Sequence, residues 1–334
     1  MGNTLLNINN LKVSFFTPAG EVKAINDISL RMEEGDVLGI VGESGSGKSV
    51  TAYSIMGLIP YPGKIVSGSI EFNGHNIHEM TEKELQNMRG NEVSIIFQDP
   101  MTSLNPVYTV GNQIQEALFL HTKMDKQQAY ERSLELLNLV GINEPERRLK
   151  QYPHELSGGM RQRVMIAIAL ACEPKLLIAD EPTTALDVTI QAQIIELMME
   201  LKKKINMSII LITHDLGIVA SMCDKIAVMY AGKIVESGSA DDIFYNPQHE
   251  YTKGLLKSIP NLNKKEREKL VPIKGVPVDM LNPPAGCPFA PRCDKCMKIC
   301  LRQMPEYTNV SDNHICACWL LQKKAYEAAT GGER

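Results

Sequence analysis

The sequence predicts an α/β protein built on a mostly parallel core sheet. Four short apolar runs each stop abruptly at a small or polar residue, helical patterns lie between them, and a glycine-rich loop directly follows the first run. Continuous apolar runs are typical of strands that are covered on both faces of a sheet. The four runs occupy residues 37–41, 93–97, 176–179 and 208–213.

The composition favours one large domain with a smaller appendage. The chain has 334 residues and a hydrophobic content of 44%. This length exceeds the size at which a single hydrophobic core usually stops growing. Its 35 Lys and Arg against 39 Asp and Glu give a net charge of −4, without the basic surplus that nucleic acid attracts. We therefore expect no nucleic-acid partner. With no apparent signal peptide and no apolar run near the ~18 residues of a membrane span, the chain is expected in the cytoplasm.

The N-terminal region predicts two antiparallel strands within residues 11–30, ahead of the first apolar run. The alternation of Leu11, Val13 and Phe15 directs Phe15 toward the core. Its neighbour Phe16 is therefore expected to face away from the core.

The first apolar run leads into a phosphate-binding loop. The segment GESGSGKS matches the pattern G-x-x-x-x-G-K-[ST], with a strand before it and a helical stretch after it. Glycines allow the backbone N–H groups to face phosphate, and the helix dipole adds positive potential. Lys48 should reach the β- and γ-phosphates, and the Ser49 hydroxyl should bind Mg²⁺. We expect a nucleoside triphosphate to bind Gly42, Glu43, Ser44, Gly45, Ser46, Gly47, Lys48 and Ser49.

The other three runs also end at residues whose side chains can take part in catalysis or metal binding. Gln98 follows the second run, Asp180 and Glu181 follow the third, and His214 follows the fourth. Ligands of open α/β sheets lie beyond the carboxyl ends of the strands. Asp180 is expected to hold magnesium through water, and Glu181 to polarise an attacking water.

Helical patterns cover residues 109–121 and 127–140, between the second and third runs. A further glycine-rich helix start follows within residues 154–171. Ser157 is a good N-cap residue there, and the glycines Gly158 and Gly159 leave the first amides uncovered. The sequence therefore predicts a second anion site.

The complete set of motifs resembles the ATP-binding subunit of ABC transporters. The segment LSGGM at 156–160 is similar to the family signature LSGGQ, with Met160 in place of glutamine, and LLIADE is similar to Walker B. Gln98 matches the Q-loop glutamine, Asp187 ends a D-loop-like TTALD, and His214 matches the switch histidine. The segments FQDPMTSLNPVYTVG and GCPFAPRC narrow the resemblance to the oligopeptide and dipeptide importer branch.

This resemblance implies a P-loop NTPase of the ABC cassette type. Such a cassette has a parallel core sheet, an N-terminal antiparallel β subdomain and an inserted helical subdomain, here followed by a small Cys-rich C-terminal extension. We expect the cassette at 1–260, its helical subdomain at about 99–160, and the extension at 261–334.

The family's mechanism implies a role for each motif. Two cassettes meet head to tail, and each ATP lies between the phosphate loop of one and the signature of the other. Glu181 is expected to act as general base and His214 to contact the γ-phosphate. Gln98 is expected to serve as the hinge into the helical subdomain and to join Ser49 and Asp180 at Mg²⁺. Nucleotide contacts across the dimer are expected from Ser157, Gly158 and Gly159. One N-terminal aromatic is expected to stack on adenine, Phe16 in preference to Phe15.

The function implied is an ATP-hydrolysing subunit that powers import of di- or oligopeptides. Its expected partners are two transmembrane permease subunits, a second ATPase subunit, either a related chain or a second copy, and indirectly an extracytoplasmic peptide-binding protein. Its expected location is the cytoplasmic face of the membrane, as a peripheral subunit. Two alternatives are an importer of nickel or another small solute, and a soluble ABC ATPase without a transport role.

Cysteines concentrate near the C-terminus, where six of the eight in the chain follow residue 286. Disulfides are disfavoured in a reducing cytoplasm, so this spacing predicts a metal site. A tetrahedral zinc site could use Cys293, Cys296, Cys316 and Cys318. The importer tail instead resembles a [4Fe-4S] site formed by Cys287, Cys293, Cys300 and Cys318, which we prefer, with zinc as the alternative.

Overall fold

The computed structural model describes residues 3–99, 103–184, 186–258 and 272–322, and it contains two compact units. The first unit includes the residues up to Leu5, Glu33–Val37 and His75–Ile212. The second includes Leu6–Met32, Leu38–Gly74 and the described chain from Thr213 onward. The predicted boundary between residues 260 and 261 lies outside the described residues, as do residues 100–102 of the predicted helical subdomain.

The first unit is organised around parallel strands in the order β8, β7, β6. Their bounds are β6 (Val93–Ile96), β7 (Leu176–Asp180) and β8 (Ser208–Thr213). Ile178 of β7 lies opposite Ile95 of β6, and Ala179 lies opposite Leu211 of β8. Every residue of β7 and β8 is buried, which confirms the prediction of strands covered on both faces.

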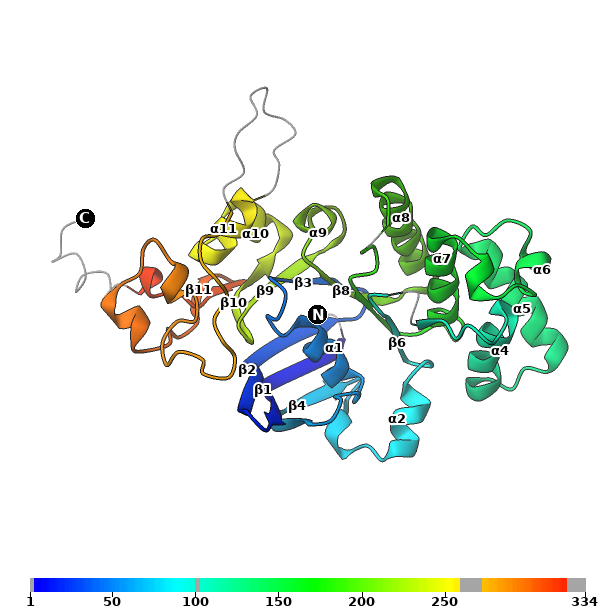
Figure 1. The fold of residues 1–334 in the computed structure, drawn as a ribbon, viewed down its shortest axis with the longest axis horizontal. Coiled ribbons are helices and arrows are strands. Elements are labelled where there is room, and N and C mark those ends of the chain that lie inside the picture. Colours follow the sequence, from blue (N-terminus) through cyan, green and yellow to red (C-terminus); the bar gives the residue numbers. More distant parts are fainter. Residues whose placement is uncertain (1–2, 100–102, 185, 259–271, 323–334) are drawn as a thin grey trace, which may run out of the picture. The chain divides into compact units, whose positions relative to one another are not determined.

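Helices of the first unit begin where the sequence provides caps. The side chain of Thr109 accepts the N–H of Asn112, and Asp125 forms a capping box with Gln128. The helices are α2 (Glu82–Met88), α4 (Val110–His121), α5 (Lys126–Leu139), α6 (Pro145–Arg148), α7 (Gly158–Ala169) and α8 (Val188–Ile205). Helices α4, α5 and α7 pack against one another (Figure 1).

The second unit contains the predicted antiparallel sheet. Its strands β2 (Gly20–Glu33), β1 (Thr4–Thr17) and β4 (Gly63–Phe72) lie in that order. Strands β1 and β4 are antiparallel, with Val13 opposite Ile65. Val13 is buried and Phe16 is exposed, which agrees with the predicted alternation. The short strand β5 (His75–Asn76) belongs to the first unit.

A second set of strands in this unit carries the phosphate loop at one end. Strand β3 (Val37–Val41) pairs in parallel with β9 (Lys225–Tyr230), and β10 (Lys233–Ser239) is antiparallel to β9. Strands β12 (His314–Cys316) and β11 (Thr308–Ser311) then continue the sheet, each antiparallel to its neighbour. The Cys-rich extension is therefore joined to β10 by main-chain hydrogen bonds.

Short helices complete the second unit. These are α1 (Lys48–Ile55), α9 (Leu216–Met222), α10 (Ala240–Tyr245) and α11 (Glu250–Lys257). Single 3₁₀ turns occur at Ile77–Glu79, Pro153–Glu155, Ala290–Arg292, Lys298–Leu301 and Trp319–Leu321 across the two units. Among the helices that the structure describes, none combines the length and apolar character needed to cross a membrane.

A buried acid and histidine attach the extension to β10. The Nε2 atom of His314 in β12 lies 2.8 Å from Oε1 of Glu236 in β10, and neither side chain is exposed to solvent. The Glu236 carboxylate also accepts the backbone N–H groups of Gln248 at 2.6 Å and His249 at 2.9 Å. A buried carboxylate requires such partners, because its desolvation is otherwise uncompensated.

His249 should make the stability of this unit depend on pH. Burial lowers the pKa of His249 to about 4. The charge of Lys253 lowers this pKa further, whereas the charge of Glu250 raises it. Its Nδ1 atom accepts the N–H of Tyr251 at 3.1 Å, which requires an unprotonated nitrogen. Below the unfolded pKa near 6.5, the unfolded chain binds a proton that the folded chain does not. The free energy of unfolding should therefore be lower at pH 5 than at pH 7 by about 2 kcal/mol from this residue.

Urea unfolding of the wild type and of His249→Asn at both pH values tests this expectation. The asparagine carbonyl can cap the same N–H but does not titrate. The variant should therefore lose about 2 kcal/mol of the pH dependence, whatever its stability at pH 7. An equal pH dependence in both proteins would contradict the assignment.

Candidate functional site

The predicted phosphate loop connects β3 to α1 in the second unit. Its Lys48 side chain is buried and folds back across the loop. The Lys48 Nζ atom donates to the carbonyl oxygens of Gly42 at 2.7 Å and Glu43 at 2.9 Å. Gly47 precedes α1 in the left-handed conformation, with a φ of 102°. The loop therefore curls tightly around its lysine.

Two of its glycines are required by close approach to neighbouring backbone. A Cβ atom on Gly42 would lie 2.1 Å from the carbonyl oxygen of Met229 in β9. A Cβ atom on Gly47 would lie 2.6 Å from the carbonyl oxygen of Ala24 in β2. Real Cβ atoms do not approach oxygen this closely, so the loop conformation excludes any side chain at these positions.

Glu43, also in the loop, is held by two residues that sequence reasoning missed. Its backbone N–H donates to the Tyr251 hydroxyl at 2.8 Å. Its carboxylate forms a two-pronged ion pair with Arg292, at 2.6 Å and 3.0 Å. Arg292 lies 249 positions away in the extension, so no local pattern could have connected it to the loop.

In the first unit, the structure brings Gln98 and Glu181 together. Asp180 ends β7 as a buried carboxylate, and Glu181 follows it with a left-handed φ of 48°. The Glu181 N–H donates to the carbonyl oxygen of Ile212 at 2.8 Å. The Oε2 atom of Glu181 accepts hydrogen bonds from Gln98 Nε2 and Thr184 Oγ1, both at 2.9 Å. This arrangement fixes the direction of the carboxylate.

The helix start predicted as a second anion site also lies in the first unit. Ser157 is the N-cap of α7, and its hydroxyl oxygen accepts the N–H of Met160 at 3.3 Å. The space beside Gly158 is open, whereas a Cβ atom on Gly159 would lie 3.1 Å from a methyl group of Ile190. The helix start is exposed and its first amides are uncovered, so it could bind an anion.

The remaining predicted residues lie in the second unit with the phosphate loop. His214 follows β8 and is exposed, and the adjacent Asp215 caps α9 by accepting the N–H of Gly217 at 2.8 Å. Phe16 is exposed, with the Lys64 ammonium 5.4 Å from its ring centre. The structure therefore places the phosphate loop, His214 and Phe16 in one unit, and Gln98, Asp180, Glu181 and the signature residues in the other.

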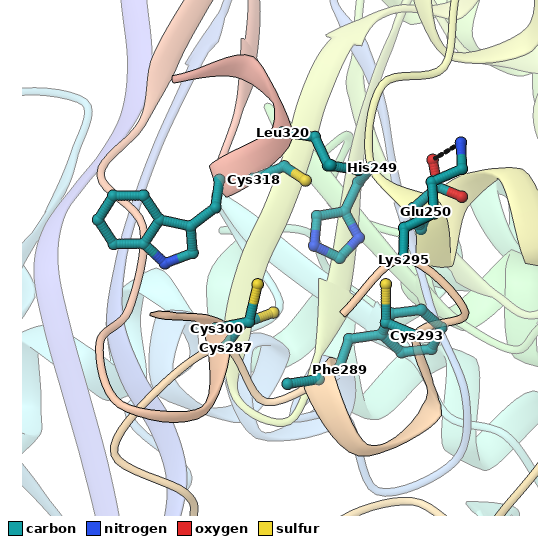
Figure 2. A pocket seen from close by; sticks show the side chains of 11 residues that line it. His249, Glu250, Cys287, Phe289, Cys293, Lys295, Cys300, Cys318 and Leu320 are labelled. Carbon is teal, nitrogen blue, oxygen red and sulfur yellow. Dashed lines mark hydrogen bonds and ion pairs between the residues drawn. The ribbon is translucent and has the colours of Figure 1, made fainter. Parts of the chain in front are cut away.

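The extension contains a pocket lined by thiols. Cys287, Cys293, Cys300 and Cys318 line it, whereas Cys296 and Cys316 do not. Figure 2 shows the four thiols around the pocket together with Phe289 and His249. An ion pair at the rim joins Lys295 to Glu250 at 3.1 Å.

The prediction of a metal centre in this pocket is wrong. Among residues 3–99, 103–184, 186–258 and 272–322, no group of three or more His, Cys, Asp or Glu side chains could hold a metal ion. Neither the predicted [4Fe-4S] cluster nor the alternative zinc site therefore has a ligand set among the described residues. Burial raises the pKa of Cys287 to about 12 and that of Cys293 to about 11.

Comparison with known proteins defines the family. Residues 25–184 match the ABC transporter family, and residues 235–300 match the oligopeptide/dipeptide transporter C-terminal region. The chain is 54% identical to the dipeptide transport ATP-binding protein DppD of Bacillus subtilis (strain 168), over 98% of each chain. It is 57% identical to the oligopeptide transport ATP-binding protein OppD of the same strain, over 96% of this chain and 90% of the relative.

A solved structure supports the predicted fold class. The ATP-binding cassette MJ0796, in a dimeric post-hydrolysis state bound to ADP and Pi, superposes with a TM-score of 0.64 at 26% identity. The match covers 71% of this chain and 99% of the cassette. The predicted P-loop NTPase fold of the ABC cassette type is thus confirmed. The structural match and the sequence matches together show that the chain belongs to the ABC transporter family, as an ATPase with the C-terminal region of oligopeptide/dipeptide transporters.

Proposed function

We propose that the chain hydrolyses ATP to power the import of di- or oligopeptides through separate transmembrane permease subunits. The observation that carries this proposal is an ABC cassette continued by the oligopeptide/dipeptide transporter C-terminal region at residues 235–300. Relatives that match nearly the whole chain are named for dipeptide and oligopeptide transport. Nickel import and a role outside transport are not favoured by these matches.

The phosphate loop is proposed to bind the triphosphate of ATP through the backbone N–H groups of residues 42–49. The buried Lys48 now donates to the Gly42 and Glu43 carbonyl oxygens, so its ammonium is already directed along the loop. On binding, it would exchange these partners for the β- and γ-phosphate oxygens. The ring of Phe16 is proposed to stack on adenine, because Phe16 is exposed whereas Phe15 is partly buried.

Ser49, Gln98 and Asp180 are proposed to hold Mg²⁺. A hydroxyl, an amide carbonyl and a carboxylate are oxygen donors of the kind that this ion prefers. Since the Gln98 nitrogen donates to Glu181, its carbonyl oxygen can serve as the ligand atom. Held by these residues, Mg²⁺ would supply charge neutralisation for the phosphates.

Glu181 is proposed to accept a proton from the water that attacks the γ-phosphate. The hydrogen bonds from Gln98 and Thr184 orient its carboxylate before the nucleotide binds. His214 is proposed to contact the γ-phosphate and to respond to its loss. Gln98 connects the acid to the chain leading into α4 and α5, so it could relay the nucleotide state to the helices proposed to dock the permeases.

A second cassette is proposed to complete the ATP site. The exposed N-terminus of α7, with Ser157, Gly158 and Gly159, would donate hydrogen bonds to the γ-phosphate bound by the partner's loop. The dimeric state of the related MJ0796 cassette supports this arrangement. The partner is either a related chain or a second copy. The assembly would lie at the cytoplasmic face of the membrane and receive peptides from an extracytoplasmic binding protein.

Uptake and co-purification together test the proposal. Cells lacking the chain should lose uptake of labelled di- or oligopeptides, and wild-type protein should restore it. Detergent extracts should yield the tagged chain together with two multi-span proteins. Normal peptide uptake in the deletion strain, with loss of nickel or another solute instead, would contradict the peptide assignment.

A further inference from the structure

We propose that Arg292 is a positioning residue of the phosphate loop, which fixes Glu43 and neutralises its charge so that the loop binds the nucleotide's phosphates more tightly. This proposal rests on the nucleotide-binding role proposed above for the loop. It assigns to the C-terminal extension a direct part in the ATP site of its own chain.

The contact between Arg292 and Glu43 is a paired, charge-assisted one. The Arg292 Nη1 atom donates to Oε2 of Glu43 at 2.6 Å, and Nη2 donates to Oε1 at 3.0 Å. The Arg292 side chain is 4% exposed and that of Glu43 is 25% exposed. Two parallel hydrogen bonds in a largely water-excluded place fix the orientation of a carboxylate far better than a surface ion pair does.

The guanidinium is itself fixed from several sides. Its Nε atom donates to the carbonyl oxygen of Lys274 at 2.9 Å, and Nη1 also donates to the Tyr230 hydroxyl at 3.2 Å. Its central carbon lies 5.8 Å from the ring centre of Tyr230 and 6.0 Å from that of Phe289. Arg292 is therefore a rigid cation presented to the loop by the extension.

Glu43 transmits this constraint to the residues proposed to contact phosphate. Its carbonyl oxygen accepts hydrogen bonds from Lys48 Nζ at 2.9 Å and from the N–H of Ser46 at 3.2 Å. Its own N–H is held by Tyr251 at 2.8 Å. A shift of Glu43 would therefore displace the first turn of the loop and the phosphate-binding lysine.

Charge provides a second effect in the same direction. Glu43 places a carboxylate in a loop proposed to bind a triphosphate, and like charges repel strongly where water is partly excluded. The Arg292 guanidinium cancels this repulsion. Without it, the loop would carry an uncompensated negative charge beside its anionic ligand.

Affinity for Mg-ATP, measured by titration calorimetry on the full chain, tests the proposal. Arg292→Gln should weaken binding about tenfold, the scale of one charged hydrogen-bond pair, and raise KM for ATP more than it lowers kcat. Arg292→Lys keeps the positive charge but cannot form the two-pronged contact. Its affinity for Mg-ATP should lie between those of the wild type and Arg292→Gln. The decisive protein is Glu43→Gln/Arg292→Gln, which removes the uncompensated carboxylate without restoring the two-pronged contact, and should therefore recover part of the lost affinity.

The matched control is Lys295→Gln, which removes another cation of the extension that pairs with Glu250 rather than with the loop. It should leave the affinity for Mg-ATP within about twofold. The proposal is overturned if Arg292→Gln binds Mg-ATP like the wild type, or if the added Glu43→Gln change gives no recovery. Lys48→Ala distinguishes this from a failure of the proposed function, because normal Mg-ATP binding by that variant would refute the role of the loop itself.

Discussion

Replacing Glu181 by glutamine should abolish ATP turnover while the protein still binds ATP. Glutamine has the same shape and can still accept the hydrogen bonds that Gln98 and Thr184 donate to the carboxylate. It cannot accept the proton of the attacking water, and loss of a general base typically costs 10²–10⁴-fold in rate. Phosphate release by the assembled transporter and the affinity for Mg-ATP, measured in parallel, separate the chemical step from binding.

Thr184→Ala is the control for this prediction. It removes one hydrogen bond to the same carboxylate but leaves the base in place. Its turnover should therefore fall much less than that of Glu181→Gln, by about tenfold at most. Unchanged turnover in Glu181→Gln would refute the assignment of Glu181 as the base.

Gly42→Ala should weaken ATP binding about a hundredfold. The added Cβ would lie 2.1 Å from the carbonyl oxygen of Met229 and 2.8 Å from the Ser46 hydroxyl oxygen. The start of the loop would have to move away from β9, and overpacking of this kind typically costs 1–3 kcal/mol, which corresponds to as much as about a hundredfold in affinity. Calorimetric titration with Mg-ATP, with circular dichroism to verify folding, measures the effect.

Gly35→Ala is the matched control for the steric argument. Gly35 also has a positive φ, of 81°, but a Cβ atom there meets nothing within 4 Å. It also lies outside the loop. This variant should lose about 1–2 kcal/mol of stability from the backbone conformation alone and bind ATP normally. If Gly42→Ala also binds ATP normally, the close approach to Met229 does not constrain the loop.

The sequence alone determined the strands, helix start and loop that depend on residues close together in the chain. The continuous apolar runs specify strands β3, β6, β7 and β8, because both faces of each must be buried. The hydroxyl of Ser157 and the glycines after it specify the start of α7. The phosphate loop is also local, since its glycines and lysine lie within one short segment. The motifs, their order and the branch of the family were therefore readable from the chain.

Only the tertiary structure decided which distant residues meet. Gln98 reaches Glu181 across 83 positions and Arg292 reaches Glu43 across 249, and no periodic pattern encodes such pairs. Cysteine spacing likewise suggested a metal centre, yet spacing fixes neither the arrangement of thiols nor their protonation. In the folded extension, burial raises the pKa of the Cys287 and Cys293 thiols, because desolvation disfavours the charged form. Long-range packing sets the environment of a side chain, and the residues next to it in the sequence do not determine that environment.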